Sequence, residues 1–198
     1  ASEFLGADLL LNGSSAANNE QIKAGKQLGM QHAQLVEFSS VIATDSGIQL
    51  SSVKAADSAY PLRGQLRSAA APYELESVGD GPKPGEAWVE PRLLSALEVN
   101  IGDSVEVGQK VLKLTRVLTY EPDRAGDFYS LTPRLLMNLA DLDATGVVQP
   151  GSRVKYSELW RGTADQIAAY RQQIEPGLAP SQRLLGAKDG NQQVGGAL

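Results

Sequence analysis

The sequence contains no cysteine and a single histidine, so much of the chemistry that side chains can supply is missing. Without thiols, disulfides, zinc sites built on cysteine and thiol catalysis are excluded. The lone histidine, His32, lies in an extended and mostly polar run, and we expect a surface strand residue there rather than a general base. Phosphate-loop, dinucleotide-binding and calcium-loop motifs are absent as well, so neither a metal nor an organic cofactor is expected.

Long apolar runs and basic blocks are also missing. No stretch approaches the roughly 20 apolar residues that cross a bilayer, and no signal-type segment precedes the first predicted strand. The formal net charge is -5, and no basic helix face could follow a phosphate backbone, which excludes nucleic acid as a partner. The chain has 198 residues with 42% apolar and 21% charged content, values typical of a folded soluble protein with one large or two small domains.

Hydrophobic periodicity predicts a mixed α+β chain. Before residue 62 we expect a strand at 7–11, a helix at 21–29, and a long hairpin formed by runs 31–44 and 48–55 around the turn 45–47. After residue 151 we expect a strand from Ser152, a helix with a capping box at Thr163 to Gln166, and a strand near 183–187.

The middle of the chain is predicted to be a smaller module. Residues 68–85 are rich in alanine, proline, glycine and acidic residues, and we expect a flexible boundary there. A short helix from Pro91 and two strands around 108–110 follow, and Pro133 is expected to begin a helix that carries Leu135, Leu139 and Leu142 on one face. The predicted division is 1–61 with 152–198 as one unit, into which 62–151 is inserted.

The string Gly102–Ser104, Gly-Asp-Ser, suggests an esterase nucleophile and provides an enzymatic alternative. A serine nucleophile normally needs a base within hydrogen-bond reach, and such esterases supply it from a downstream Asp-x-x-His that this sequence lacks. Because the Gly-Asp pair, Gly102 and Asp103, lies between a predicted helix and an alternating strand, a turn explains these residues better than a nucleophile does. We therefore expect no enzymatic activity.

The densest charges lie in TYEPDRAGDFYS, Thr119 to Ser130. We interpret it as a solvated loop in which Arg124 pairs with Glu121 or Asp127, in exposed pairs that contribute about 0 to 1 kcal/mol each. Its aromatic residues Phe128 and Tyr129 either anchor the loop on the core or contact a partner. Arg124, Phe128 and Tyr129 are thus the candidate partner contacts, and a metal-binding or catalytic role for the carboxylates is the least favoured alternative.

Four strings, in this order along the chain, carry a family resemblance: LGADLLL, VKAADSAYPLRGQL, GEAWVEPRLLSALEVNIGDSVEVG and LTYEPDRAGDFYSLTPRLLMNLADLDATGVVQPGSRVKY. Together they resemble the extracytoplasmic domain of MacB/FtsX/LolC-type ABC transporter permeases, and the YbbP-like permeases are the most similar. The resemblance implies a Porter-like subdomain of β-α-β units (1–61 and 152–198) with an inserted Sabre-like subdomain (62–151). It implies no catalytic residues.

Further expectations follow from this resemblance alone. The domain would lie between two transmembrane helices on the periplasmic side of the bacterial inner membrane, in agreement with a chain that begins without an initiator methionine. It would couple ATP hydrolysis by a cytoplasmic ABC ATPase to periplasmic motion, for extraction or export of hydrophobic compounds. Its other partners would be the second periplasmic domain of the permease and a periplasmic esterase. The alternative is a stand-alone periplasmic module that binds a hydrophobic ligand or a protein.

Overall fold

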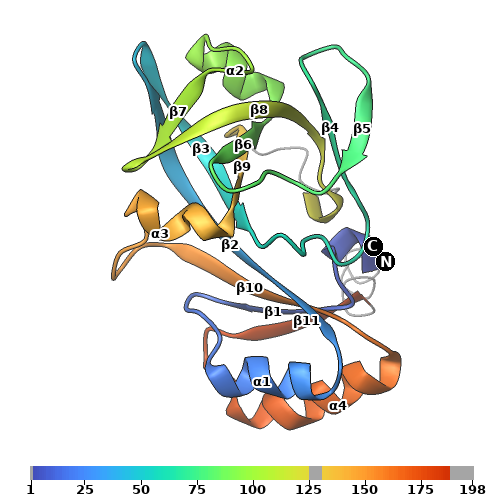
Figure 1. Cartoon of the computed structure of the whole chain (residues 1–198). Helices are drawn as coiled ribbons and strands as arrows, with labels where there is room; N and C mark the ends of the chain where they lie inside the picture. The colour runs from blue at the N-terminus through green and yellow to red at the C-terminus, as the bar shows by residue number, and fades with distance from the viewer. Residues whose placement is uncertain (1, 125–130, 188–198) are drawn as a thin grey trace.

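The computed structural model describes residues 2–124 and 131–187, and strands dominate it (Figure 1). The strands are β1 (Leu9–Gly13), β2 (Gln31–Thr44), β3 (Gly47–Ala56), β4 (Leu66–Ala69), β5 (Glu76–Gly79), β6 (Glu86–Val89), β7 (Ser104–Val107), β8 (Lys110–Tyr120), β9 (Arg134–Asn138), β10 (Val154–Arg161) and β11 (Arg183–Gly186). The helices are α1 (Asn19–Gln27), α2 (Pro91–Leu97), α3 (Leu142–Thr145) and α4 (Ala164–Ile174), with 3₁₀ turns at Ser2–Leu5, Pro122–Arg124, Leu139–Asp141 and Glu175–Gly177. The mixed α+β chain expected from the sequence is confirmed.

Part of the sheet closes into a barrel, which forms the upper part of Figure 1. The hydrogen-bonded order around it is β2-β3-β9-β6-β8-β7, and β7 returns to β2 where Val107 pairs with Ile42. Apolar side chains fill the interior, as expected of a small barrel. Helix α2 adds Leu93, Leu94 and Leu97 to this core. The barrel core therefore depends on pairing between strands that are far apart in the sequence.

The lower layer is the sheet β11-β1-β10-β2, with α1 and α4 against one face (Figure 1). Its core contains Leu9, Trp160, Tyr170 and Ile174. Helix α1 approaches Trp160 closely because residue 25 is glycine: a Cβ there would lie 2.3 Å from the indole ring. This contact requires the absence of a side chain.

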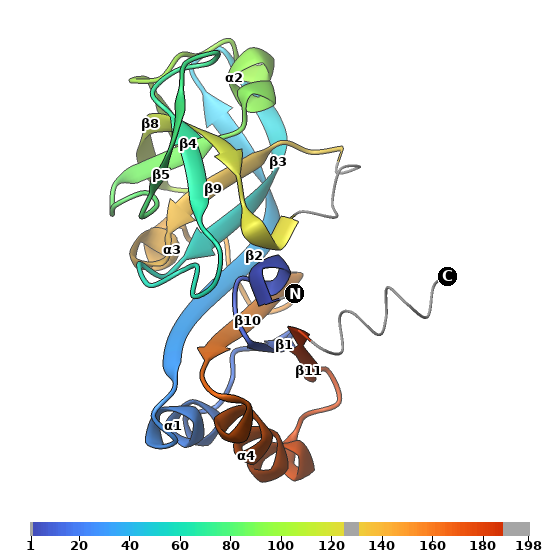
Figure 2. The same ribbon diagram turned by 90° about the vertical axis from the view of Figure 1, so that its right-hand side faces the viewer.

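Strand β2 belongs to both parts, as the rotated view in Figure 2 shows. On one edge it pairs with β10 along Gln31–Phe38 and then with β7 at Ile42 and Ala43, while β3 occupies the other edge. With 14 residues at about 3.3 Å each, β2 is about 46 Å long. A single strand thus connects the barrel to the helix-covered layer.

Most local predictions are confirmed. The hairpin β2–β3, helix α2 and the strand pair β7–β8 lie where periodicity placed them. Both helices of the lower layer begin with capping boxes, at Asn18 with Gln21 and at Thr163 with Gln166. The Gly-Asp-Ser string forms a turn that leads into β7, and an Asp103 carboxylate oxygen accepts a hydrogen bond from the amide of Asn100. The division into 1–61 with 152–198 and an inserted 62–151 stays a prediction.

Two element predictions are wrong. The segment after Pro133 forms strand β9 rather than a helix, because Leu135 faces the barrel interior while Leu136 packs on the outside. A strand buried on both faces is apolar throughout and shows no alternation. Leu139 and Leu142, which completed the helical spacing with Leu135, lie beyond β9 in a 3₁₀ turn and in the short helix α3. The predicted flexible boundary at 68–85 instead carries the hairpin β4–β5, and β4 pairs with β8.

Candidate functional site

A fully buried lysine marks the outer surface of the barrel. Lys54 lies on β3 between Val53 and Ala55, which face the barrel core, so its side chain points outward. Its Nζ lies 2.8 Å from Glu121 Oε1 and 2.8 Å from Asp123 Oδ2, and the side chain is 0% exposed. A buried ammonium is tolerated only when opposite charges and hydrogen bonds surround it.

Glu121 is the central anion of this site. Besides Lys54, it contacts Arg134 with a Nε–Oε1 distance of 3.3 Å and Arg124 with a Nη1–Oε2 distance of 3.0 Å. Its side chain is only 2% exposed. Three cations therefore surround one almost completely buried carboxylate.

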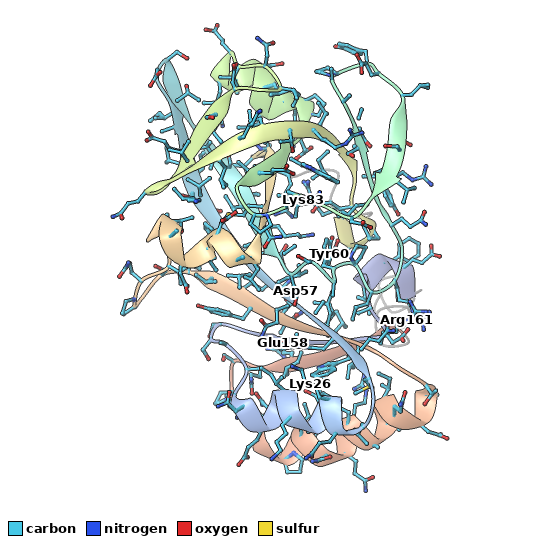
Figure 3. All side chains as sticks on the ribbon, in the orientation of Figure 1. Lys26, Asp57, Tyr60, Lys83, Glu158 and Arg161 are labelled. Carbon is cyan, nitrogen blue, oxygen red and sulfur yellow. The ribbon has the colours of Figure 1, made fainter. Side chains whose placement is uncertain are left out.

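Asp123 and Tyr60 complete the set. The Tyr60 hydroxyl donates a hydrogen bond to Asp123 Oδ1, and it lies 3.2 Å from Lys54 Nζ. Tyr60 lies at the junction between the barrel and the lower layer (Figure 3). We call these residues the Lys54 cluster: Lys54, Tyr60, Glu121, Asp123, Arg124 and Arg134.

Two glutamates border the Lys54 cluster on opposite sides. Glu90, the N-cap of α2, accepts hydrogen bonds from the Arg124 guanidinium at 3.1 Å and from the Arg134 amide at 2.6 Å. Glu37 on β2 lies 3.6 Å from Arg134 and 3.8 Å from Lys155 of β10. The ionic contacts therefore extend from the helix of the barrel to a strand of the lower layer.

Burial and neighbouring charges shift the pKa values of Lys54, Glu121 and Tyr60. Burial alone would lower the pKa of the Lys54 ammonium, but the carboxylates of Asp123 and Glu121 outweigh it and raise that pKa above its ordinary value. Burial alone would raise the pKa of Glu121, but Lys54, Arg134 and Arg124 together lower it to about 2. Burial and the two carboxylates raise the pKa of Tyr60 well above its usual value. Lys54 and Glu121 are therefore ionised and Tyr60 is neutral across the physiological range.

The geometry suits attachment rather than chemistry. Lys54 comes from β3 and Arg134 from the start of β9, while Glu121 to Arg124 lie at the 3₁₀ turn after β8. Pro122 is the first residue of this turn, and its ring restricts the backbone angle φ there. The network fastens that turn to the outside of the barrel. In the part of the chain that the structure describes, no group of three or more histidine, aspartate or glutamate residues could hold a metal ion.

The low pKa of Glu121 predicts acid sensitivity. A carboxylate whose pKa falls from 4.5 unfolded to about 2 folded contributes stability above pH 4.5, and this stability is lost as the pH falls through about 2. We expect a loss on the order of 3 kcal/mol in the free energy of unfolding across that window, measured by urea unfolding monitored by circular dichroism. Glu121→Gln should flatten the pH dependence, whereas Glu20→Gln, on the exposed surface of α1, should leave it unchanged. Equal slopes for the two variants would contradict the assignment.

The structure corrects the interpretation of TYEPDRAGDFYS. Arg124 does pair with Glu121, as predicted, but the pair is largely buried, with side chains 14% and 2% exposed. The solvated-loop prediction is thus wrong for Glu121 through Arg124. Asp127 and the candidate contacts Phe128 and Tyr129 lie outside the described residues, so their role stays a prediction.

Sequence reasoning did not identify Lys54, Tyr60 or Arg134 as members of the site. One signal was available for Lys54: it stands between Val53 and the small apolar pair Ala55–Ala56 in a strand, where a lysine needs a partner. The partners lie 67 and 69 residues further along the chain, at Glu121 and Asp123, beyond any local pattern.

His32 was expected at the surface, and this is wrong. Its ring stacks on Trp160 with centroids 4.4 Å apart, and its Nε2 lies 2.5 Å from Glu158 Oε2, with the side chain 12% exposed. Ile42 is ten positions after His32 on β2, which is about 33 Å of strand, and Ser104 lies beyond Ile42 on β7. The two residues therefore cannot form the dyad that the esterase alternative needs.

Comparison with known proteins identifies relatives among transporter permeases. No protein-family model matches the chain. It is 31% identical over 193 residues to "Uncharacterized ABC transporter permease YbbP" of Escherichia coli K12, an alignment that covers 98% of this chain and 23% of YbbP. The chain thus spans about a quarter of the length of that relative.

Solved structures show a similar fold. The extracellular domain of the ABC-type transporter YknZ from Gram-positive bacteria has a TM-score of 0.58 at 12% identity, covering 90% of this chain and 100% of that domain. The periplasmic region of MacB from Actinobacillus actinomycetemcomitans has a TM-score of 0.59 at 8% identity, covering 97% and 94%. A domain of a permease-like protein from Porphyromonas gingivalis has a TM-score of 0.54 at 9% identity, covering 91% of each chain. Within residues 2–124 and 131–187, no helix is long and apolar enough to cross a membrane.

Proposed function

We propose that this chain, which is similar to part of the ABC transporter permease YbbP, is a periplasmic domain of such a permease and moves when a cytoplasmic ATPase hydrolyses ATP. The observation that carries the proposal is the 31% identity to YbbP along 98% of the chain. The fold supports it as well, because it is similar to that of the solved extracytoplasmic domains. The family expected from the four sequence strings is thereby confirmed.

A mechanical role requires that force applied at one end of the domain reaches the other end. Two features support this. Strand β2 runs without interruption from the lower layer into the barrel, and the Lys54 cluster fixes the turn after β8 to β3 and β9. Ionic contacts through Glu37 continue towards Lys155 of β10. We infer that the barrel and the lower layer move together as one body.

The partners in this proposal are those that the family implies. They are a cytoplasmic ABC ATPase, the second periplasmic domain of the same permease, a periplasmic esterase and a hydrophobic substrate to be extracted or exported. Arg124, Phe128 and Tyr129 remain the proposed contacts with one of them. Because Arg124 is tied to Glu121 and Glu90, Phe128 and Tyr129 are the more direct candidates.

The proposal predicts nucleotide-dependent movement of the intact domain. In the full-length permease with its ATPase, spin labels would be placed at Ser95→Cys on α2 and at a site in the second periplasmic domain. We expect the distance between these labels to change between nucleotide-free and ATP-trapped states. A second pair within this chain, Ser95→Cys and Ser181→Cys, spans the barrel and the lower layer and should keep its distance. Both serines are exposed and the chain has no native cysteine, so these labels are unique within it.

An ATPase subunit that binds but cannot hydrolyse ATP serves as the control, and it should hold the trapped distance without cycling. Identical inter-domain distances in every nucleotide state would overturn the coupling. A change within the Ser95–Ser181 pair would instead contradict movement as one body. The stand-alone binding module predicts no nucleotide response in either pair.

A further inference from the structure

An apolar stripe lies on the outside of the barrel, beyond the Lys54 cluster. Val41 pairs directly with Leu50, and Ile48 pairs with Ala43, so their side chains share one face of the β2–β3 hairpin. Val41, Leu50 and Ile48 are 47%, 49% and 71% exposed. This face is the outer one, because the neighbouring Ile42 is completely buried in the barrel core.

On β7 an exposed glutamate, Glu106, separates the stripe from one further apolar side chain on β8. Ala43 pairs with Glu106 of β7, and Glu106 pairs with Val111 of β8, which is 54% exposed. Lys113 lies opposite Ser104 on the same outer face, so this end of the stripe carries one charge of each sign. Exposed apolar side chains that adjoin in this way are typical of binding surfaces.

A cationic groove adjoins the other end of the stripe. Ser39 and Ser52 form the next pair along the hairpin, and they line a cavity of about 350 Å³ together with Arg134, Arg153 and Lys155. Arg153 and Lys155 are exposed, whereas Arg134 is held by Glu121. Glu37 is the only carboxylate among the described residues that line the groove, and it lies at 3.8 Å from Lys155. The groove therefore has an excess of positive charge.

The strand register sets the order of these features. From Glu37, which pairs with Lys155, the outer face of β2 presents Ser39, Val41 and Ala43 in turn. Six residues at about 3.3 Å each span about 20 Å. The hydrocarbon core of a bilayer is about 30 Å thick, so one acyl chain covers about 15 Å. The polar and apolar parts together are thus about as long as an acyl chain with its carboxylate, and the pairs Val41–Leu50 and Ala43–Ile48 form the apolar end.

We infer that this outer face binds a free fatty acid, with its carboxylate at Arg153 and Lys155 and its acyl chain along Val41, Leu50 and Ile48. The hydroxyls of Ser39 and Ser52 lie between the two parts. Ser39 can donate to the carboxylate, and Ser52, whose hydroxyl lies 2.7 Å from that of Thr132, can donate when Thr132 supplies the proton of their hydrogen bond. The inference names a substrate class for the proposed transporter and so rests on the proposed function. Charge complementarity and length together favour this occupant over an uncharged hydrocarbon.

The test uses the 198-residue chain and cis-parinaric acid, a fluorescent fatty acid, with its methyl ester as the uncharged analogue. The acid should bind saturably and be displaced by palmitate, and the ester should bind about tenfold more weakly because it lacks the carboxylate. Arg153→Glu with Lys155→Glu should weaken binding of the acid by about tenfold or more while leaving the ester unchanged. Ile48→Asn with Leu50→Asn should weaken both probes by about tenfold.

Two control variants make the same kinds of change, a charge reversal and a loss of apolar area, away from the proposed binding face. Lys23→Glu reverses an exposed charge on α1, and Leu75→Asn removes an apolar side chain that is 94% exposed before β5. Both should bind the acid as the parent chain does, and circular dichroism melts should confirm the fold of every variant.

Equal affinities for acid and ester would overturn the proposal, and so would binding that the Arg153 and Lys155 changes leave intact. Sedimentation showing self-association that Ile48→Asn with Leu50→Asn abolishes, without fatty-acid binding, would assign the face to a second copy. Association only with vesicles containing phosphatidylglycerol would assign it to a membrane surface. Either result overturns the inference. Since no nucleotide is involved, failure here is distinguishable from failure of the distance measurements.

Discussion

Replacement of Lys54 by methionine is expected to lower the free energy of unfolding by about 3 to 5 kcal/mol, because it leaves buried carboxylates without their cation. Asp123 is affected most, since Lys54 and Tyr60 are the contacts that the structure shows for its carboxylate. Glu121 keeps Arg124 and Arg134. Methionine has a similar length and no charge, so the change isolates the electrostatic contribution. Equilibrium urea unfolding at neutral pH measures it.

Two further variants test this explanation. Lys155→Met removes a lysine of β10 that is 57% exposed and should cost at most about 1 kcal/mol. Lys54→Met combined with Asp123→Asn removes the uncompensated charge, and it should recover part of the lost stability. A loss for Lys54→Met no greater than that for Lys155→Met would show that the Lys54 cluster does not hold the turn in place.

Truncation of Trp160 to alanine is expected to lower the free energy of unfolding by about 3 to 5 kcal/mol, the range for removing a large aromatic side chain from a core. Trp160 is completely buried on β10, between His32 at 4.4 Å and Tyr170 at 5.1 Å between ring centroids. Helix α1 rests on it at Gly25. The cavity should loosen the packing of both α1 and α4 on the lower sheet.

The same variant reports on cooperativity. The chain has two tryptophans, so Trp160→Ala leaves Trp88, which is buried outside the barrel on β6, as the sole indole probe. Because β2 is common to both parts, urea unfolding followed by Trp88 fluorescence and by circular dichroism should give one coincident transition. Trp160→Phe keeps part of the ring volume and should cost less than the alanine change. Separate transitions would mean that the lower layer unfolds alone.

The sequence predicted elements whose cause is local. The capping box at Thr163 and the alternation of the β2–β3 hairpin are set by residues within a few positions of one another. The barrel is different, because its closure joins β7 to β2 and β9 to β3 over long sequence separations. Periodicity cannot report such pairing, and it also misassigned β9, whose two buried faces remove the alternation that identifies a strand.

The candidate site was predicted only in part, for a similar reason. Charge density identified the segment around Glu121 and Asp123, but it could not show whether that segment was exposed to solvent or buried. Burial followed from Lys54 and Arg134, which reach the same point from other strands. The apolar stripe was not predicted, because apolar residues such as Val41, Ile48 and Leu50 are common in strands. Only the strand pairing shows that they face away from the barrel interior.

The length of β2 has a consequence for stiffness. Its backbone pairs residue by residue with β10 over Gln31–Phe38 and with β3 over Leu35–Thr44, so both ladders overlap in the middle of the strand. A pull along β2 loads these hydrogen bonds in shear, all at once, whereas a pull across a strand end would unzip them singly. The domain should therefore yield far less to tension between its two ends than to peeling at an edge such as β11.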